Sequence, residues 1–121
     1  MQATRIEHNR KMIIKNVDIA AVDLGEGVSR KILSSGGNMM TAQFSFEKGA
    51  VGTPHTHPHE QVGYVVHGSF ELTLADEKTI ISTGDTYYVP SGVVHGVVAL
   101  EDGVLLDVFT PQREDFLETL D

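Results

Sequence analysis

The segment GAVGTPHTHPHEQ, residues 49–61, contains three closely spaced histidines and a glutamine, and it decides the interpretation of the chain. In extended backbone, residues i and i+2 point to the same side, so His55 and His57 present two imidazoles to one face. Gln61, four residues later, has the same parity and adds an amide oxygen. The segment therefore predicts two nitrogens and one oxygen that converge on a metal ion.

A second segment, GDTYYVPSGVVH, residues 84–95, supplies a fourth candidate ligand. Its glycine and proline residues shape a tight corner that delivers the imidazole of His95 from a strand. Three imidazoles and one oxygen donor suit one divalent transition metal, Ni, Zn, Mn, Fe or Co, without indicating which. A lone HxH pair is common without metal, and surface histidines are the alternative. The combined spacing of the two segments favours the metal site.

The rest of the chain has the pattern of an all-β protein. Short runs with period two, rich in Val, Ile, Phe and Thr, are broken every few residues by Gly, Pro or Asp. They predict strands at residues 18–23, 28–34, 38–46, 61–67, 69–74, 79–82, 86–89, 94–100 and 104–109. So many short strands, whose edges need cover, predict a closed barrel or a jelly roll.

The two ends of the chain differ from this pattern. Residues 1–11 are polar and without periodicity, and they predict a tail that is flexible or docked on a neighbour. Residues 12–121 are expected to form the barrel and one short C-terminal helix. This helix would begin near Pro111 and present Phe116, Leu117 and Leu120 as its apolar face.

Composition excludes several classes of function. The chain has 121 residues, which suits one domain, and it has no cysteine, so disulfides, thiolate ligands and thiol nucleophiles are excluded. A net charge of −8 argues against nucleic acid and anionic lipid as partners. The apolar runs are too short for a membrane span or a signal peptide. We expect a soluble, cytoplasmic protein, and a homodimer that covers exposed strand edges.

A second unusual segment is VLLDVFTPQREDF, residues 104–116. Alternation places Leu105, Asp107 and Phe109 on one face of a strand that is otherwise apolar on both faces. A carboxylate there is costly unless it is paired or used, and a cavity shared with the metal would suit Asp107 to acid/base chemistry. Arg113 is the partner either of a substrate carboxylate or of Asp107 in a structural pair, and spacing leaves both open.

Both histidine segments resemble the two motifs of the cupin family, G-x5-H-x-H-x3-E-x6-G and G-x5-P-x-G-x2-H-x3-N. The matching positions are Gly49, His55, His57, Gln61 and Gly68, then Gly84, Pro90, Gly92, His95 and Ala99. Gln61 replaces the usual Glu and Ala99 the usual Asn. A neutral amide leaves the metal its full charge and makes it a stronger Lewis acid, whereas a vestigial site is the alternative. The resemblance implies a single-domain double-stranded β-helix, or jelly-roll barrel.

Within the cupins, HTHPHEQVGYVVHG (residues 55–68) and LLDVFTPQREDF (residues 105–116) look like the KdgF-type pectin degradation proteins, over about residues 40–116. This resemblance implies metal-dependent conversion of cyclic 4,5-unsaturated uronates from pectin or alginate to the linear 4-deoxy-5-keto uronate. The implied metal ligands are His55, His57, Gln61 and His95. The implied active-site residues are Asp107, Phe109 and Arg113.

Cupins host other functions, and two alternatives stay open. One is a dioxygenase or lyase that acts on another small acid, and the other is a domain that binds an acidic sugar without reacting. His59 lies near the expected barrel mouth, where it contacts either substrate or solvent, and His67 beside a turn has no assigned role. His8 in the tail is expected to play no part.

Overall fold

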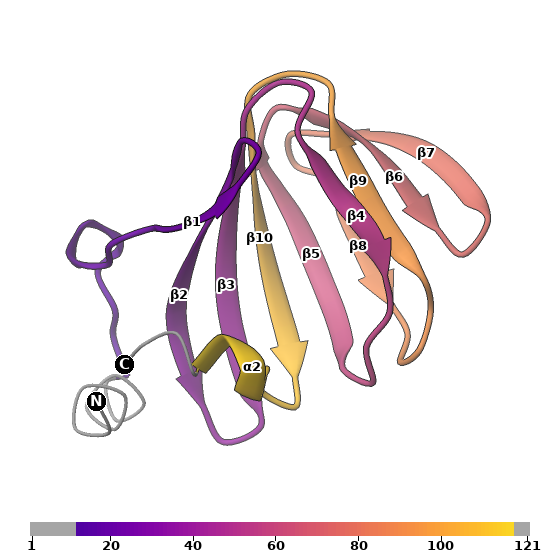
Figure 1. The fold of residues 1–121 in the computed structure, drawn as a ribbon. Helices are drawn as coiled ribbons and strands as arrows, with labels where there is room; N and C mark the ends of the chain where they lie inside the picture. The colour runs from indigo at the N-terminus through magenta and orange to yellow at the C-terminus, as the bar shows by residue number, and fades with distance from the viewer. Residues whose placement is uncertain (1–11, 118–121) are drawn as a thin grey trace.

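The inward and outward alternation of side chains builds two facing antiparallel sheets in the computed structural model, which describes residues 12–117 (Figure 1). The larger sheet contains, in spatial order, β1 (Val22–Gly25), β2 (Val28–Gly36), β3 (Met39–Phe46), β10 (Gly103–Thr110), β5 (Glu60–His67) and β8 (Thr86–Val89). The smaller sheet contains β4 (Val51–His55), β9 (His95–Ala99), β6 (Ser69–Leu74) and β7 (Glu77–Ser82). The all-β prediction is confirmed.

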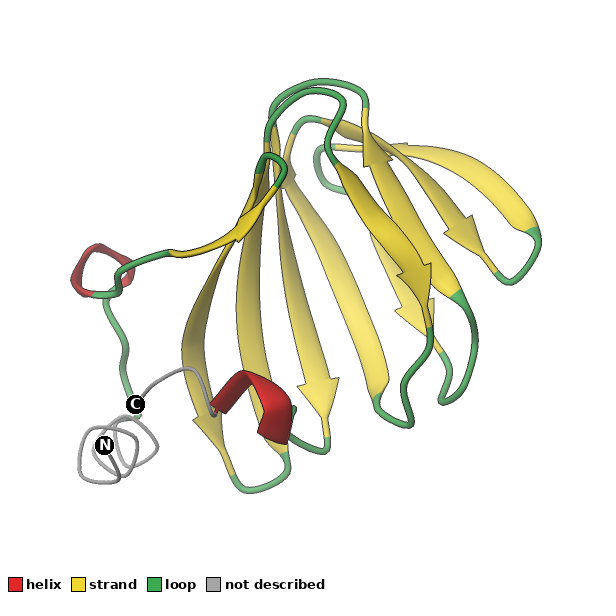
Figure 2. Cartoon of the chain, in the orientation of Figure 1, coloured by secondary structure: helices red, strands yellow, loops and turns green. Residues whose placement is uncertain are grey.

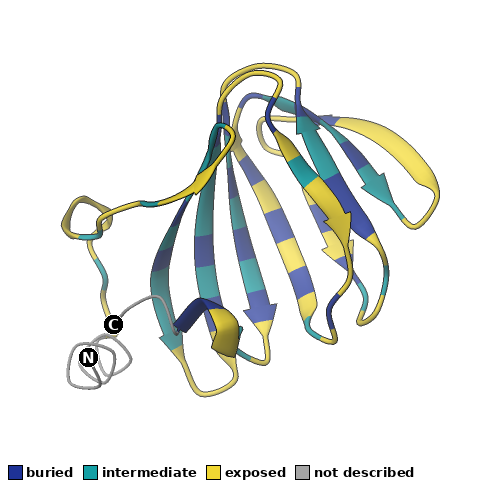
Figure 3. Cartoon of the chain, in the orientation of Figure 1, coloured by how far each residue is buried: buried dark blue, intermediate teal, exposed yellow. Residues whose placement is uncertain are grey.

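Burial along β10 and β5 follows the period of two that the sequence predicted, and it appears as stripes in Figure 3. On β10, Leu105, Asp107 and Phe109 are buried, while the residues between them are half-buried on the other face. On β5, Gln61 and Gly63 point inward in the same way. The interior face of the larger sheet therefore carries polar groups among its apolar ones.

The core has two parts. One, between the sheets, includes Phe70 and Val65, which are fully buried. The other lies under the helix α2 (Glu114–Leu117), whose Phe116 and Leu117 pack with Phe109 and with residues of β2 and β3. Figure 2 shows this helix lying against the larger sheet. The short C-terminal helix is thus confirmed, and the part of its predicted face at residue 120 lies outside the described residues.

The N-terminal strand differs from its prediction. Residues 16–18 form a 3-10 turn, η1 (Asn16–Asp18), and β1 begins only at Val22. Side-chain hydrogen bonds account for the turn, because Lys31 donates to the Asn16 side chain at 2.7 Å and Asn16 donates to Gln43 at 2.8 Å. Tertiary polar contacts with β2 and β3 therefore override the β pattern of this segment.

The strand β4 has no counterpart among the predicted strands, since its sequence VGTPH contains glycine and proline. The proline is tolerated because β4 lies at the edge of the smaller sheet, where the missing N–H group removes no interior hydrogen bond. Within residues 12–117, no helix is long and apolar enough to span a membrane. The predicted tail at residues 1–11, with its histidine, lies outside the described residues.

Candidate active site

Three imidazoles converge at one end of the space between the sheets. His55 ends β4, His95 begins β9 directly opposite, and His57 follows in the loop that leads to β5. The ring centroids of His55 and His95 lie 4.4 Å apart, and those of His57 and His95 lie 4.8 Å apart. One ligand nitrogen from each ring lies within 4.8 Å of the others, a geometry that can hold a metal ion.

The predicted ligands do converge, but the route differs from the prediction. The sequence placed His55, His57 and Gln61 on one continuous extended segment. The structure instead bends the chain after His55, so that His57 lies in a loop and Gln61 enters from β5 in the other sheet. Side-chain parity along a single strand is therefore not what brings these groups together.

Backbone carbonyls orient all three rings. The Nδ1 atoms of His55, His57 and His95 lie 2.9, 3.0 and 3.0 Å from the carbonyl oxygens of Thr53, His59 and Val93. A carbonyl only accepts, so each Nδ1 carries the proton and each Nε2 carries a lone pair. The Nε2 atom of His95 is buried and has no hydrogen-bond partner. A bound cation fits this orphaned lone pair.

Gln61 completes the donor set. Its Oε1 atom lies 3.1 Å from Nε2 of His57, and both atoms carry lone pairs when Nδ1 of His57 is protonated. Burial lowers the pKa of His57, and the nearby Arg113 lowers it further. Burial also lowers the pKa of His95, so both imidazoles are neutral at neutral pH, the form that binds metal. Three nitrogens and one amide oxygen fit a divalent transition metal.

Asp107 lies inside the same space, with 4% of its surface exposed. The hydroxyl of Tyr87 donates a hydrogen bond of 2.7 Å to its Oδ1 atom. Burial raises the pKa of Asp107 to about 6, while hydrogen bonds from Tyr87 and Gln61 and the charge of Arg113 oppose that rise. The carboxyl group can therefore exchange a proton near neutral pH.

Arg113 does not form the structural pair with Asp107 that the sequence left open. Its guanidinium group binds the carboxylate of Asp115 through two hydrogen bonds of 3.1 and 2.9 Å. It also lies 4.1 Å above the ring of Phe116 and 5.2 Å from that of Phe109. The guanidinium of Arg113 thus already makes a bidentate contact with a carboxylate, and it can bind a ligand carboxylate in the same way.

Phe109 joins the two halves of the site. It is 2% exposed, and its ring packs edge to face on His57 at 5.8 Å and on Phe116 at 5.6 Å. The ring of Phe109 thus contacts both the histidine cluster and the aromatic ring that lies beneath Arg113.

A cavity of about 360 Å³ links these groups. Most of the predicted site residues line it, namely His55, Gln61, His95, Asp107, Phe109 and Arg113. His57 is buried against the cluster, His59 is half-buried beside it, and His67 is exposed at the end of β5. The cavity is large enough for a monosaccharide and carries a carboxyl group, a ligand cluster and a cation.

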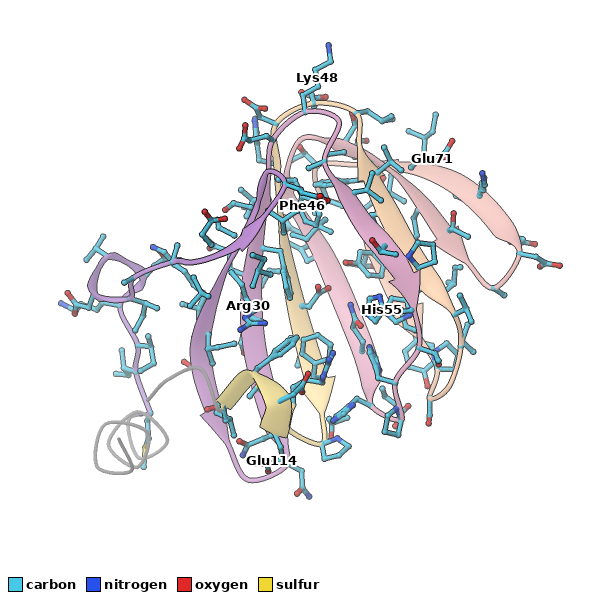
Figure 4. All side chains as sticks on the ribbon, viewed as in Figure 1. Arg30, Phe46, Lys48, His55, Glu71 and Glu114 are labelled. Carbon is cyan, nitrogen blue, oxygen red and sulfur yellow. The ribbon has the colours of Figure 1, made fainter. Side chains whose placement is uncertain are left out.

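Two residues that line the cavity were missed from the sequence, Arg30 and Tyr87. Arg30 is 7% exposed on β2, and its guanidinium lies 4.2 Å above the ring of Phe116. Figure 4 shows it on the wall opposite His55. Its parity with Val28 and Ile32 was a usable signal, because a charge at an inward position of a strand is unusual. Tyr87 shares its inward face with Val89, so a polar hydroxyl at an interior position was a similar signal.

Comparison with known proteins shows which families and structures this chain resembles. A model described as the cupin domain matches residues 42–109. The pectin degradation protein KdgF of Dickeya dadantii (strain 3937) is 48% identical over 97 residues, which cover 78% of this chain and 88% of that protein. Among solved structures, KdgF from Halomonas sp. is 41% identical with a TM-score of 0.84, covering 88% of this chain and 98% of that one.

A second solved structure supports the same fold. The RmlC-like cupin from Shewanella frigidimarina is 35% identical, with a TM-score of 0.86, covering 90% of this chain and 98% of the other. The likeness to this cupin therefore covers most of the chain.

Proposed function

Because this chain belongs to the cupin domain family, and within it to the KdgF-type pectin degradation proteins, we propose that it is an enzyme of pectin breakdown. Its reaction is the ring opening of 4,5-unsaturated uronate monosaccharides, released from pectin or alginate, to the linear 4-deoxy-5-keto uronate. One observation carries the proposal. The buried carboxyl group of Asp107 lines the same cavity as the histidine cluster and the guanidinium of Arg113.

The reaction needs proton shifts and no redox step. The hydroxyl group on C1 loses its proton and becomes an aldehyde carbonyl as the C1–O5 bond breaks, and O5 takes up a proton and remains on C5 as an enol. The enol hydroxyl then loses its proton as C4 gains one, which makes C5 a ketone, so substrate and product are isomers. Asp107, inside the cavity, is the group that accepts and returns a proton.

Other side chains bind and orient the sugar. The guanidinium of Arg113 holds the C6 carboxylate by two parallel hydrogen bonds, as it now holds Asp115. The ring of Phe109 packs beside the sugar and excludes water from Asp107. His55, His57, Gln61 and His95 would hold a divalent metal, which would supply Lewis acidity.

The test is turnover of the two candidate sugars. Purified protein is added to unsaturated galacturonate freshly released by a pectate lyase, and separately to the unsaturated uronate released by an alginate lyase. The absorbance of the enol ether is followed, and the product is identified by NMR. Loss of absorbance with formation of the 5-keto product supports the proposal, and the faster of the two sugars identifies the preferred source.

Other results would identify another function. Oxygen consumption during turnover would contradict the proposal and favour a dioxygenase. Saturable binding of the sugar without any loss of absorbance would contradict it and favour a sugar-binding domain. The protein-free reaction is the control, because unsaturated uronates also open spontaneously.

A further inference from the structure

Asp107, Gly63 and Tyr87 occupy one row across three neighbouring strands of the larger sheet. Asp107 on β10 pairs with Gly63 on β5, and Gly63 pairs in turn with Tyr87 on β8. All three positions are buried and face the interior. Neighbouring strands are spaced by about 4.8 Å, so the backbones of Asp107 and Tyr87 are roughly 10 Å apart. Two side chains so far apart meet only if nothing stands between them.

Gly63 provides that opening. A Cβ atom added at Gly63 would lie 2.0 Å from Cζ of Tyr87 and 2.4 Å from its hydroxyl oxygen. The ring of Tyr87 therefore lies directly over the backbone of β5, in the space that any other residue would fill. Glycine weakens a strand interior, and it commonly marks a close approach of this kind. The close approach lets the tyrosine hydroxyl cross β5 and reach Asp107 at 2.7 Å.

The carboxylate of Asp107 has a second polar neighbour. Gln61, which also faces inward from β5, lowers the pKa of Asp107, while its side-chain oxygen faces His57. Tyr87 is 8% exposed and Gln61 is 5% exposed, so water does not compete freely for the carboxyl group. The hydrogen bond from Tyr87 therefore restricts rotation of this group about its Cβ–Cγ bond.

We propose that Tyr87 is a positioning residue for Asp107, acting through the opening at Gly63. The proposal rests on the ring-opening function given above. The hydroxyl holds Oδ1 and so leaves Oδ2 to exchange protons with the substrate. Catalysis depends on such orientation, and a small misplacement of a catalytic group costs up to about 100-fold in rate. The hydroxyl proton is directed at Asp107, so Tyr87 contributes to turnover and little to substrate affinity.

The variant Tyr87→Phe separates this role from packing, because it keeps the ring over Gly63 and removes only the hydroxyl. We expect kcat to fall by about 10- to 100-fold with KM unchanged and metal content retained. The matched control is Tyr88→Phe. Tyr88 is the next residue on β8, half-exposed on the outer face, and its hydroxyl is bonded to Glu60. This control is expected to keep wild-type kcat.

The variant Gly63→Ala tests the opening itself. The added methyl group displaces the tyrosine ring, so kcat should fall at least as far as in Tyr87→Phe. Wild-type kcat in Tyr87→Phe would overturn the proposal, as would a raised KM with kcat unchanged, because that pattern indicates a direct contact with substrate. Both outcomes are measured on folded, metal-loaded Tyr87→Phe, so they decide the proposal even if Gly63→Ala does not fold.

A wild-type protein that does not turn over uronates would contradict the proposed function, and the inference is then tested by stability. Urea unfolding is compared for Tyr87→Phe, Asp107→Asn and the double variant. A double variant that loses less stability than the two single losses combined supports a hydrogen bond that orients Asp107. Additive losses would overturn it, because the two side chains would then be uncoupled.

Discussion

The Nε2 atom of His57 and the Oε1 atom of Gln61 lie 3.1 Å apart with no proton to share between them. The proton of His57 is on Nδ1, where the carbonyl of His59 accepts it. The Oε1 atom of Gln61 is an amide oxygen, which carries no proton. Two lone pairs that face each other repel unless a cation lies beside both, which is why this contact supports a metal site.

The first prediction concerns that metal. We expect one divalent metal ion per chain by elemental analysis, and loss of most of it in His95→Ala, whose buried Nε2 has no other partner. The control is His67→Ala, at the exposed end of β5. Metal at 100 times its Kd should stabilise the fold by about 2.7 kcal/mol, seen as a raised Tm. Full metal content in His95→Ala would contradict the assignment of ligands.

The second prediction concerns the amide of Gln61. In Gln61→Glu the metal should be retained, since a carboxylate is also a ligand. The kcat should fall by about 10-fold or more, because the new carboxylate adds a like charge beside Asp107 and raises its pKa. Gln43→Glu makes the same change outside the cavity and serves as control. Unchanged kcat in Gln61→Glu would show that a neutral group beside Asp107 is not needed for turnover.

The third prediction concerns competition for Arg113. Asp115 is 61% exposed, yet it occupies both prongs of the guanidinium group. A substrate carboxylate must exchange with it, so Asp115→Asn should lower KM by about 2- to 5-fold, the effect of an exposed ion pair. Glu114→Gln, on the same short helix, is the control. Arg113→Lys should raise KM instead, since an ammonium cannot make the two parallel contacts. A higher KM in Asp115→Asn would show that Asp115 orients Arg113 for the substrate.

The fourth prediction is a pH dependence of stability in metal-free protein. The pKa of Asp107 is about 6 in the fold, against 3.8 as the ordinary value, so the folded state binds more protons between these pH values. Stability from this group is therefore greatest below about pH 4, falls as the pH rises to about 6, and is constant above it. A pKa difference of about 2 corresponds to about 3 kcal/mol.

The variant Asp107→Asn isolates this contribution from that of the other carboxylates. The free energy of unfolding of the wild type, minus that of Asp107→Asn, should decrease between pH 4 and 6 in urea titrations. Parallel profiles of the two proteins would show that Asp107 does not titrate in this range.

Much of the fold could be predicted because alternation of apolar residues directly reports which face of a strand is buried. Alternation fails to predict an element where hydrogen bonds or the order of strands in the sheet determine it. Residues 18–23 alternate like a strand, but hydrogen bonds of Asn16 hold the turn before them. The strand β4 contains Pro54, which only an edge position tolerates, and edges are set by strand order. The homodimer, the cytoplasmic location and the anionic sugar substrate stay predictions.

The sequence indicated which residues belong to the candidate site, but it did not indicate how the chain brings them together. Spacing singled out the four candidate ligands, but their convergence depends on a bend between His55 and His57. The contact of Tyr87 with Asp107 depends on the spatial order β10-β5-β8, which joins strands far apart in the sequence. No local pattern contains that order, so this hydrogen bond could be found only in the structure.

The most direct test compares Asp107→Ala with the wild type on freshly released unsaturated galacturonate. Enol-ether absorbance is followed, and metal content and Tm are measured on the same preparations. We predict that the wild type accelerates the loss of absorbance, whereas Asp107→Ala, with its metal retained, does not exceed the protein-free rate. Wild-type turnover in Asp107→Ala would contradict the assignment of Asp107 as the acid/base group.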